Sequence, residues 1–443
     1  MTGTGIGFVI FGVMLALMVV RVPIGIAMFS VGAAGYVYLT GGNVNALLNS
    51  LKNLAYARLS NYDLVVIPLF LLMGQFATHG GLSKALFRCV SAFLGHFKGG
   101  VAMAAVGACA AFGSVCGSSV ATAATMAKVA LPEMMRQRYS GRLATATLAA
   151  GGTLGIMIPP SVVLVIYGIL AEQNIAKLFA AAIVPGLIAT VGYCIAIAIY
   201  VRLFPEHGPA SERASWRQLG SALTDVWPIA AIFLVVFGGI YGGWFTPTEA
   251  ASIGASATFL AALLRGELTL PKFLECFFDT AATTGMIFMI FLGADVMNAA
   301  LALSQFPAAL SGIVQGLGLP PLAVVAGILA FYVILGCVMD ELSMILLTLP
   351  IFLPTIIGLD LFGLPNDQKL IWFGILVLMV VEIGLIAPPV GLNVYVINGI
   401  DRSTPIAESY RGVVPFLISD VLRTALLLLF PGISLWLVKV LVP

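Results

Sequence analysis

The chain has 443 residues, of which 60% are hydrophobic and 9% are charged. Soluble domains carry charge on roughly a quarter of their residues, so this composition indicates an integral membrane protein. At about 20 residues for each crossing, the length predicts about ten crossings and leaves no room for a fused ATPase, receptor or soluble enzyme domain. The 21 Lys and Arg residues balance 19 Asp and Glu residues without a polybasic tract, which argues against nucleic acid as a partner.

Apolar runs long enough to cross a membrane recur along the chain. They lie at residues 5–21, 23–40, 63–78, 143–172 and 180–201, then at 225–244, 247–264, 281–303, 370–400 and 413–438. The polar segment 203–222 separates the two groups and is predicted to be a cytoplasmic linker. We expect residues 1–202 and 223–443 to form two repeats. An odd number of crossings in each repeat would place the second upside down relative to the first, as in many secondary transporters.

Each group also contains an apolar stretch that is too long for one crossing and is interrupted by polar residues. In the first group the interruption is GSVCGSS (113–119), within a predicted hairpin at residues 100–134. In the second group it is GCVMDE (336–341), within a predicted hairpin at residues 321–358. The arms are shorter than a full crossing of about 20 residues, so we predict re-entrant hairpins whose tips lie inside the membrane.

A pair of adjacent prolines interrupts one apolar run in each group. GIMIPP (155–160) lies within residues 143–172, and GLIAPP (384–389) lies within residues 370–400. Two prolines remove two backbone donors and push the preceding residue out of helical geometry. We therefore predict two interrupted helices whose freed carbonyls face protein or a polar cavity. A simple proline kink is the alternative, but it does not explain two matching copies.

Basic residues flank the first hairpin far more than the second. Those beside the first hairpin are Lys84, Arg88, Lys98, Arg136, Arg138 and Arg142, whereas Lys369 alone lies beside the second. Because positive loops stay in the cytoplasm, the first hairpin is expected to enter from the cytoplasm and the second from outside. The same counting places the N-terminus in the periplasm.

Opposed helix ends define what the centre of such a protein can bind. Half-helix N-termini carry partial positive charge and suit an anion, whereas freed carbonyls suit a small hard cation. At the first hairpin tip, Ser114, Ser118 and Ser119 surround Gly117. Their hydroxyls either coordinate an ion or only cap the returning helix.

Carboxylates mark the second hairpin tip. Asp340 and Glu341 lie beside a turn inside the membrane, where ionised groups are costly and are functional candidates by default. Asp340 could also be only an N-cap for the arm that contains Ser343. Glu382 and Asn393, on either side of the second proline pair, either line the site or bridge helices.

Other polar segments are predicted to be structural. Thr246-Pro247-Thr248-Glu249 has the pattern of a capping box with proline at the first helical position, which assigns Glu249 to the cap. Residues 42–60 and 268–280 mix apolar and charged side chains at matching places in the two groups. We expect them to be interfacial arms that lie along the membrane.

Catalytic constellations are not found in the sequence, which has no GxSxG elbow, HExxH pair or Walker A loop. We therefore do not expect an enzyme. Without a nucleotide-binding loop, energy must come from an ion gradient or from the substrate itself.

Five motifs stand in order along the chain. They are FGSVCGSSVATAATMAKVALPEM (112–134), AAGGTLGIMIPPS (149–161), GGWFTPTEAA (242–251), GCVMDELSMILLTLPIFLP (336–354) and EIGLIAPPVGLNVYV (382–396). With them the chain resembles, over essentially its whole length, the large membrane subunit (DctM type) of tripartite ATP-independent periplasmic (TRAP) transporters. The resemblance implies an inverted-repeat, elevator-type secondary transporter in the bacterial cytoplasmic membrane, driven by sodium. It also implies a small four-helix membrane subunit and a soluble periplasmic protein that delivers an organic acid.

Two residues depart from the pattern of the resembling proteins. Many of them have a hydroxyl residue at the position of Ala387 and often a serine at that of Cys116. A cation beside Ala387 would therefore depend on backbone carbonyls.

These considerations give a predicted site. The substrate is expected to contact Ser118, Ser119, Pro160, Asp340, Ser343 and Asn393. Sodium is expected at Ser114, Gly117, Gly152, Thr153, Met339, Asp340, Gly384 and Pro388. No nucleotide or redox cofactor is expected.

The predicted function is a sodium-coupled importer subunit for a carboxylate-bearing solute. Its two hairpins and two interrupted helices would form a transport domain that moves against a scaffold of the other helices. A self-sufficient ion-coupled carboxylate carrier that needs no binding protein is the alternative of similar design, and a channel is the alternative from another class. The sequence does not identify the organic acid.

Overall fold

The computed structural model of the chain describes residues 3–20 and 22–442, and all regular structure in these ranges is helical. The helices of the first half are α1 (Gly3–Val19), α2 (Ile24–Leu39), α3 (Val44–Leu59), η1 (Tyr62–Val65), α4 (Val66–His79), α5 (Leu82–Leu94), α6 (Gly100–Cys116), α7 (Ser119–Arg136), α8 (Gly141–Met157), α9 (Val162–Leu170), α10 (Ile175–Leu203) and η2 (Pro205–His207). Those of the second half are α11 (Trp216–Tyr241), α12 (Pro247–Leu264), α13 (Leu270–Leu303), α14 (Phe306–Gly316), α15 (Pro321–Gly336), α16 (Glu341–Gly358), α17 (Asn366–Ile386), α18 (Leu392–Ile400), α19 (Ile406–Leu429) and α20 (Gly432–Leu441).

The all-helical membrane fold predicted from the sequence is confirmed. Seven helical segments of the described ranges are long and apolar enough to cross a bilayer, and α8 with α9 forms an eighth that is bent by 43° at its break. The predicted crossings at 5–21 and 23–40 are the shorter helices α1 and α2, of 17 and 16 residues. Arg21, at the end of the first run, lies outside the described residues. Helix α16 is itself long enough to span, so the re-entrant geometry of the second hairpin stays a prediction.

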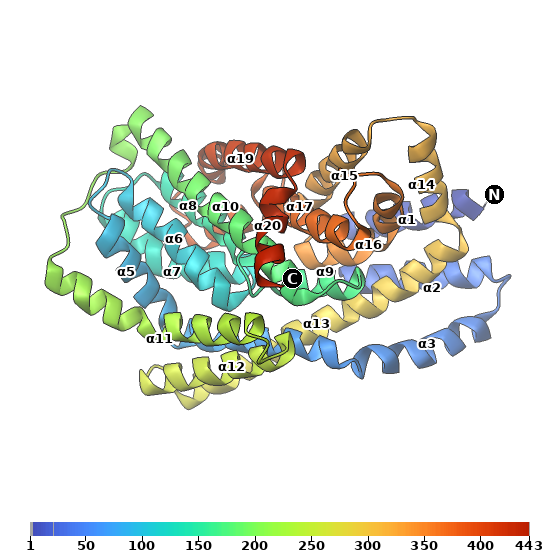
Figure 1. Ribbon diagram of the computed structural model, residues 1–443, viewed down its shortest axis with the longest axis horizontal. Coiled ribbons are helices and arrows are strands. Elements are labelled where there is room, and N and C mark those ends of the chain that lie inside the picture. Colours follow the sequence, from blue (N-terminus) through green and yellow to red (C-terminus); the bar gives the residue numbers. More distant parts are fainter. Residues whose placement is uncertain (1–2, 21, 443) are drawn as a thin grey trace.

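A layer of long helices lies along one edge of the molecule (Figure 1). In it α13 packs on α2, and α12 packs on α4. Glycines allow the first pair to approach closely: a Cβ on Gly32 would lie 2.6 Å from the backbone nitrogen of Met297. Such small-residue contacts are the usual way in which membrane helices associate.

Helix pairs form at both predicted hairpins, α6 with α7 and α15 with α16, and at both predicted interrupted helices, α8 with α9 and α17 with α18. The two sets repeat their packing partners. The outgoing arm of each hairpin packs on the interrupted helix of the same half, α6 on α8 and α15 on α17. The returning arm contacts the short helix of the other half, so that α7 meets α18 and α16 meets α9. These contacts between halves join them at the centre of the molecule. The division into two repeats at residues 202 and 223 stays a prediction.

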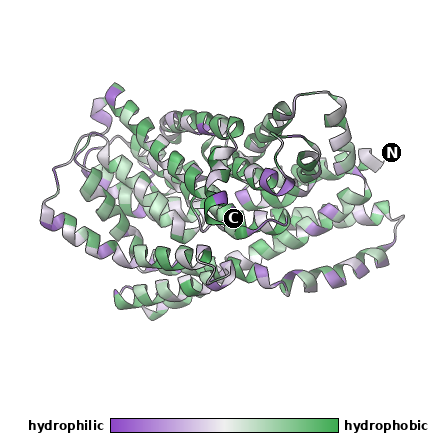
Figure 2. Ribbon diagram, viewed as in Figure 1, coloured by the Kyte–Doolittle hydropathy of each residue, from purple (hydrophilic) through white to green (hydrophobic). Residues whose placement is uncertain are grey.

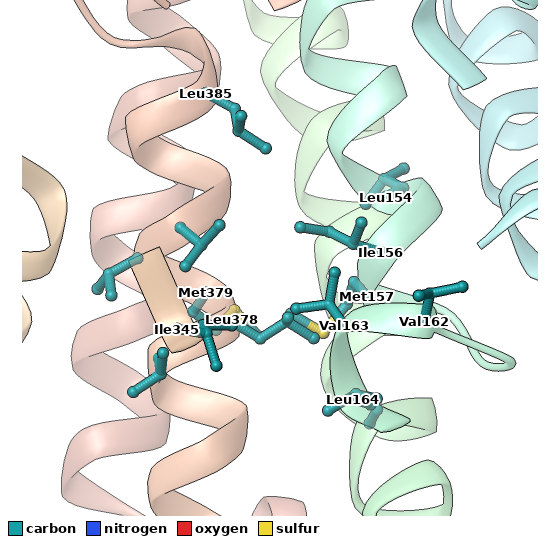
Figure 3. Close-up of a cluster of buried hydrophobic side chains, with 14 of the residues drawn as sticks. Leu154, Ile156, Met157, Val162, Val163, Leu164, Ile345, Leu378, Met379 and Leu385 are labelled. Atoms are coloured by element: carbon teal, nitrogen blue, oxygen red, sulfur yellow. The ribbon is translucent and has the colours of Figure 1, made fainter. Parts of the chain in front are cut away.

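Apolar side chains fill the interface between the halves. Figure 3 shows Met157 and Val163, beside the first proline pair, pointing toward Leu378 and Met379 of α17. All four side chains are essentially inaccessible to solvent. The core therefore reaches the breaks themselves, and the polar residues described below are set into it.

The structure corrects one predicted arm. Residues 42–60 form the separate helix α3, which ends before Asn61, whose side chain accepts a hydrogen bond from the Asp63 backbone N–H at 2.9 Å. Residues 268–280 are instead the start of the 34-residue helix α13, because residues 281–284 (AATT) provide no cap or proline at the matching place. Figure 2 shows hydrophilic residues along α3, as expected of an interfacial helix.

Two further differences concern helix ends. The predicted crossing at 413–438 divides into α19 and α20, since Pro431 cannot continue the first helix and disfavours helical geometry at Phe430, which has φ −127° and ψ 77°. Two helices were not predicted: α5, which lies between α4 and the first hairpin, and α14, which lies between α13 and the second hairpin. The predicted capping box is confirmed: the Glu249 backbone N–H donates to the Thr246 hydroxyl, and the Thr246 N–H donates to the Glu249 carboxylate at 2.8 Å.

Candidate binding centre

The two hairpin tips meet in the structure. We call residues 116–119 the first tip and residues 337–341 the second tip. The Ser119 hydroxyl donates a hydrogen bond to Oε1 of Glu341 at 3.3 Å, and both side chains are buried. Glu341 lies in the first turn of α16, where the helix dipole favours a carboxylate. The contact joins residues 222 positions apart and makes one centre of two turns.

The first tip is built by a left-handed turn and a cap. Gly117 ends α6 at φ +66°, and a Cβ there would lie 3.1 Å from the Pro160 carbonyl oxygen. Ser118 then caps α7 by accepting from the Ala121 backbone N–H at 3.4 Å. Ser114 is buried in the last turn of α6 and donates to the Ala111 carbonyl at 2.8 Å. Both serines therefore have local structural partners, whichever ligand they also bind.

Oxygen atoms of the first tip and of α7 pack closely against Gly155 of α8. A Cβ on Gly155 would lie 2.5 Å from the Thr122 hydroxyl and 2.7 Å from the Ser118 carbonyl oxygen. The Thr122 hydroxyl is buried and has no hydrogen-bond partner. Gly152 packs nearby against Ala123. Hard cations prefer such carbonyl and hydroxyl oxygens, so the residues present fit a small cation, and Thr122 is a candidate ligand that sequence reasoning missed.

The second tip carries the negative charge of the centre. Asp340 caps α16: it accepts from the Ser343 backbone N–H at 3.1 Å and from the Ser343 hydroxyl at 2.6 Å. Glu341 keeps one buried carboxylate oxygen, Oε2, without a partner, and Met339 is buried beside the cap. An uncompensated carboxylate in an apolar interior is costly, so this tip is better suited to a cation than to an organic anion.

The two breaks differ in exposure. We call residues 158–161 the first break and residues 387–391 the second break; the peptide bond within each proline pair is cis. Pro160 is buried and Ser161 caps α9. Pro388 is exposed, and α18 begins after Gly391 without a side-chain cap. Thus only the second break is open to a ligand from outside the core.

Asn393 bridges the halves at the start of α18. Its Nδ2 donates to the Ala149 carbonyl of α8 at 3.2 Å, while its buried Oδ1 has no partner. Gly384 packs directly on Gly336, since a Cβ on Gly384 would lie 2.6 Å from the carbonyl carbon of that residue. Asn393 therefore bridges helices through its Nδ2, and its Oδ1 is left free to line the site, so the two predicted alternatives are compatible.

A buried charge network lies beside the centre and confirms that Glu382 bridges helices; its members Arg423, Asp420 and Tyr193 were not predicted. Arg423 of α19 donates to Glu382 of α17 at 2.6 Å and to Asp420 at 2.8 Å. Tyr193 of α10 donates to the other Asp420 oxygen at 3.0 Å, and its ring lies against the guanidinium. All four side chains are buried, and Nε and Nη1 of Arg423 and Oε1 of Glu382 have no partner.

Thr153 belongs to this network rather than to the first tip. Its hydroxyl donates to the Ala150 carbonyl at 2.8 Å and lies 3.3 Å from the Tyr193 hydroxyl. Thr153 precedes Gly155 by the same spacing as Glu382 precedes Gly384. The network therefore connects two matching positions of the repeats, one neutral and one charged. The sequence offered one clue to this network: Asp420 and Arg423 lie three residues apart within the apolar run at 413–438, where charged residues are rare.

Comparison with known proteins gives consistent matches. Residues 11–433 match the family described as the tripartite ATP-independent periplasmic transporter, DctM component. The chain is 34% identical over 377 residues to the C4-dicarboxylate TRAP transporter large permease protein DctM of Pseudomonas aeruginosa, covering 85% of this chain and 86% of that one. It is 31% identical over 433 residues to the ectoine TRAP transporter large permease protein TeaC of Halomonas elongata, covering 96% and 97%. The crystal structure of the Alcanivorax borkumensis YdaH transporter has a similar fold, with a TM-score of 0.60 at 14% identity over 88% of this chain and 89% of that one.

Proposed function

Because this chain belongs to the DctM family of TRAP transporter large permeases, we propose that it couples sodium entry to the import of an organic acid delivered by a periplasmic binding protein. It is a multi-pass membrane protein, and its relatives are permease subunits. The proposal adds the coupling ion, the substrate class and the delivery route to that membership.

The observation that carries the proposal is the contact between Ser119 and Glu341. It brings the neutral first tip, with the N-terminus of α7, against the acidic second tip. Backbone N–H groups and hydroxyls at the first tip suit a carboxylate group, whereas the carboxylates and carbonyls at the second suit sodium. An anion and a cation bound side by side would neutralise each other, and this would make the transport of one depend on the other.

The proposed substrate class follows from the relatives and from the centre together. The relatives' names include C4-dicarboxylates and ectoine, and both kinds of molecule bear carboxylate groups. We propose that a carboxylate of the substrate reaches the first tip, and that the unpartnered Oδ1 of Asn393 accepts a hydrogen bond from a hydroxyl or ammonium group of the same substrate. The small four-helix subunit is the proposed partner of the scaffold helices.

Uptake in proteoliposomes tests this proposal. The chain, its small subunit and a periplasmic binding protein loaded with radiolabelled acid should give uptake under an inward sodium gradient, and none when choline replaces sodium. Equal uptake without the binding protein would support the self-sufficient carrier instead. Single-channel currents without a fixed ion-to-substrate ratio would support a channel.

The predicted topology has its own test. Met135, near the end of the first hairpin, and Asn366, near the end of the second, are both exposed. In a cysteine-free background, Met135→Cys should react with an impermeant thiol reagent only from the cytoplasm, and Asn366→Cys only from the periplasm. Labelling of both from one side would refute the inverted arrangement.

A further inference from the structure

A large polar cavity lies beside the first hairpin, away from the tips. It has a volume of about 1270 Å³ and is enclosed by α5, α7, the start of α11 and the linker residues 210–214. About half of its lining surface is polar, with Ser91, Gln137, Ser211 and Gln218 among the lining residues. Since the linker and the basic loops are predicted to be cytoplasmic, the cavity faces the cytoplasm under the proposed function.

The cavity carries an excess of positive charge. Lys84 and Arg88 lie one turn apart on α5, Lys128 projects from α7, and Arg213 comes from the linker. None of these four forms an ion pair with a described residue, whereas the fifth lining cation, Arg136, is paired with Glu133 at 2.7 Å. Two further carboxylates, Glu212 and Asp225, are outnumbered by the unpaired cations.

One buried hydroxyl also points to a ligand. Ser91 follows Arg88 by about one turn of α5 and lines the cavity, yet its hydroxyl is buried without a hydrogen-bond partner. A hydroxyl beside guanidinium and ammonium groups is a suitable donor to a carboxylate.

Helix α7 connects this cavity to the binding centre. The same helix carries Ser119 at its first residue and Lys128 on the cavity wall, about 14 Å further along at 1.5 Å per residue. An acid that moved from the first tip along α7 would reach Lys128, and Lys84 and Arg88 of α5 line the same cavity.

We propose that this cavity is the exit vestibule for the organic acid, and that Lys84, Arg88 and Lys128 form a weak carboxylate site in it. The inference rests on the proposed function. The three side chains are exposed, so their attraction for an anion is screened and the site releases what it attracts. A phospholipid headgroup is a poorer occupant, because the cavity has no wall of exposed large apolar side chains. Such a wall exists in the neighbouring cavity of about 800 Å³, where Trp227, Leu260 and Leu264 are exposed. Lys84 and Arg88 line both cavities and Lys128 lines only the larger one, so the test below includes a phospholipid as the competing occupant.

Charged thiol reagents measure the potential in the cavity without any transport assay. Ser221 is exposed and lines the cavity, so Ser221→Cys in a cysteine-free background is the probe. In inside-out vesicles it should react faster with a sulfonate-bearing methanethiosulfonate than with a trimethylammonium one. The triple change Lys84→Gln, Arg88→Gln and Lys128→Gln should lower the ratio of the two rates by roughly tenfold. Arg202→Gln, which removes an exposed cation outside the cavity, should not change it.

Competing anions identify the occupant. Succinate should slow the labelling of the Ser221→Cys protein and not that of the triple variant, with sodium chloride used to match ionic strength. An unchanged rate ratio in the triple variant, or protection by phosphatidylglycerol in the vesicles and not by succinate, would overturn the proposal. Lys128→Gln alone, with a smaller change in the ratio, covers the case in which the triple variant fails to fold. Absence of sodium-driven uptake by the parent would refute the proposed function. It would not change the ratio of the two labelling rates, which reports the charge of the cavity independently.

Discussion

The two breaks have the same proline pair but opposite surroundings. At the first, Pro159 and Pro160 are buried, and Ser161 closes the start of α9. At the second, Pro388 and Pro389 are exposed, α18 has no side-chain cap, and the Tyr410 hydroxyl donates to the Val390 carbonyl at 2.5 Å. The same local chemistry thus gives one closed break and one accessible break. The difference arises from the helices packed around each break rather than from the prolines.

The charge distribution follows the same division. The second half holds both tip carboxylates, and it holds Glu382, Asp420 and Arg423, whereas the matching position of Glu382 in the first half is Thr153. A repeated backbone therefore positions unlike ligands. Under the proposed function, the first half contributes neutral donors and the second half contributes charge.

The largest expected effect is at Arg423. Arg423→Met leaves two buried carboxylates without their cation and should lower the free energy of unfolding by about 3–5 kcal/mol. Thr153→Val, at the neutral end of the same network, should cost only about 1 kcal/mol. Denaturant unfolding of the detergent-solubilised protein measures both. Arg423→Met combined with Glu382→Gln should recover part of the loss, and no recovery would show that charge is not the cause.

The proline pairs come next. Replacing both prolines by alanine favours a continuous helix by about 3 kcal/mol per residue and would withdraw the carbonyls proposed to bind sodium. Each double variant should therefore lose the thermal stabilisation that sodium gives the parent. The exposed second pair should tolerate the change with less loss of folded protein. Full uptake and an unchanged sodium response in both variants would show that the prolines are only kinks.

Close glycine contacts give a smaller effect. A Cβ at Gly384 would lie 2.6 Å from backbone atoms of Gly336 that cannot move aside cheaply. Gly384→Ala should therefore destabilise by about 1–3 kcal/mol. Gly12→Ala is the matched control, because nothing lies within 4 Å of its Cβ position and alanine favours the helix by roughly 0.5–1 kcal/mol. Equal melting temperatures for the two variants would contradict the packing described between α15 and α17.

The smallest stability effect is expected at the contact between the tips. Ser119→Ala removes one hydrogen bond to Glu341 and should cost about 1 kcal/mol, yet it should raise the sodium concentration needed for half-maximal uptake severalfold. Glu249→Ala, which removes a capping side chain elsewhere, should not change that concentration. If both variants respond to sodium alike, the tips do not form the coupling centre.

The sequence predicted the elements of the fold well where a local pattern defines them. Proline pairs predicted both breaks, and polar turns predicted both hairpins. The continuity of α13 was missed because an interfacial arm and the first turns of a crossing have the same mixed composition. Helix bridging by Glu382 was one of the predicted alternatives, but its partners Asp420 and Arg423 were missed because they lie on another helix, α19, about 40 residues further along the chain. The turn of Thr153 away from the first tip depends on how α8 packs against α10.

The backbone contacts between each hairpin and its interrupted helix have a mechanical consequence. Gly113 lies against Gly155, and Gly336 against Gly384, with no room for a side chain between them. Because these contacts are made by backbone atoms alone, no side chain can change its rotamer to let the two helices shift relative to each other. Each hairpin and its interrupted helix should therefore move together as one rigid unit. The distance between two spin labels, one on the hairpin and one on its interrupted helix, should stay constant throughout a transport cycle.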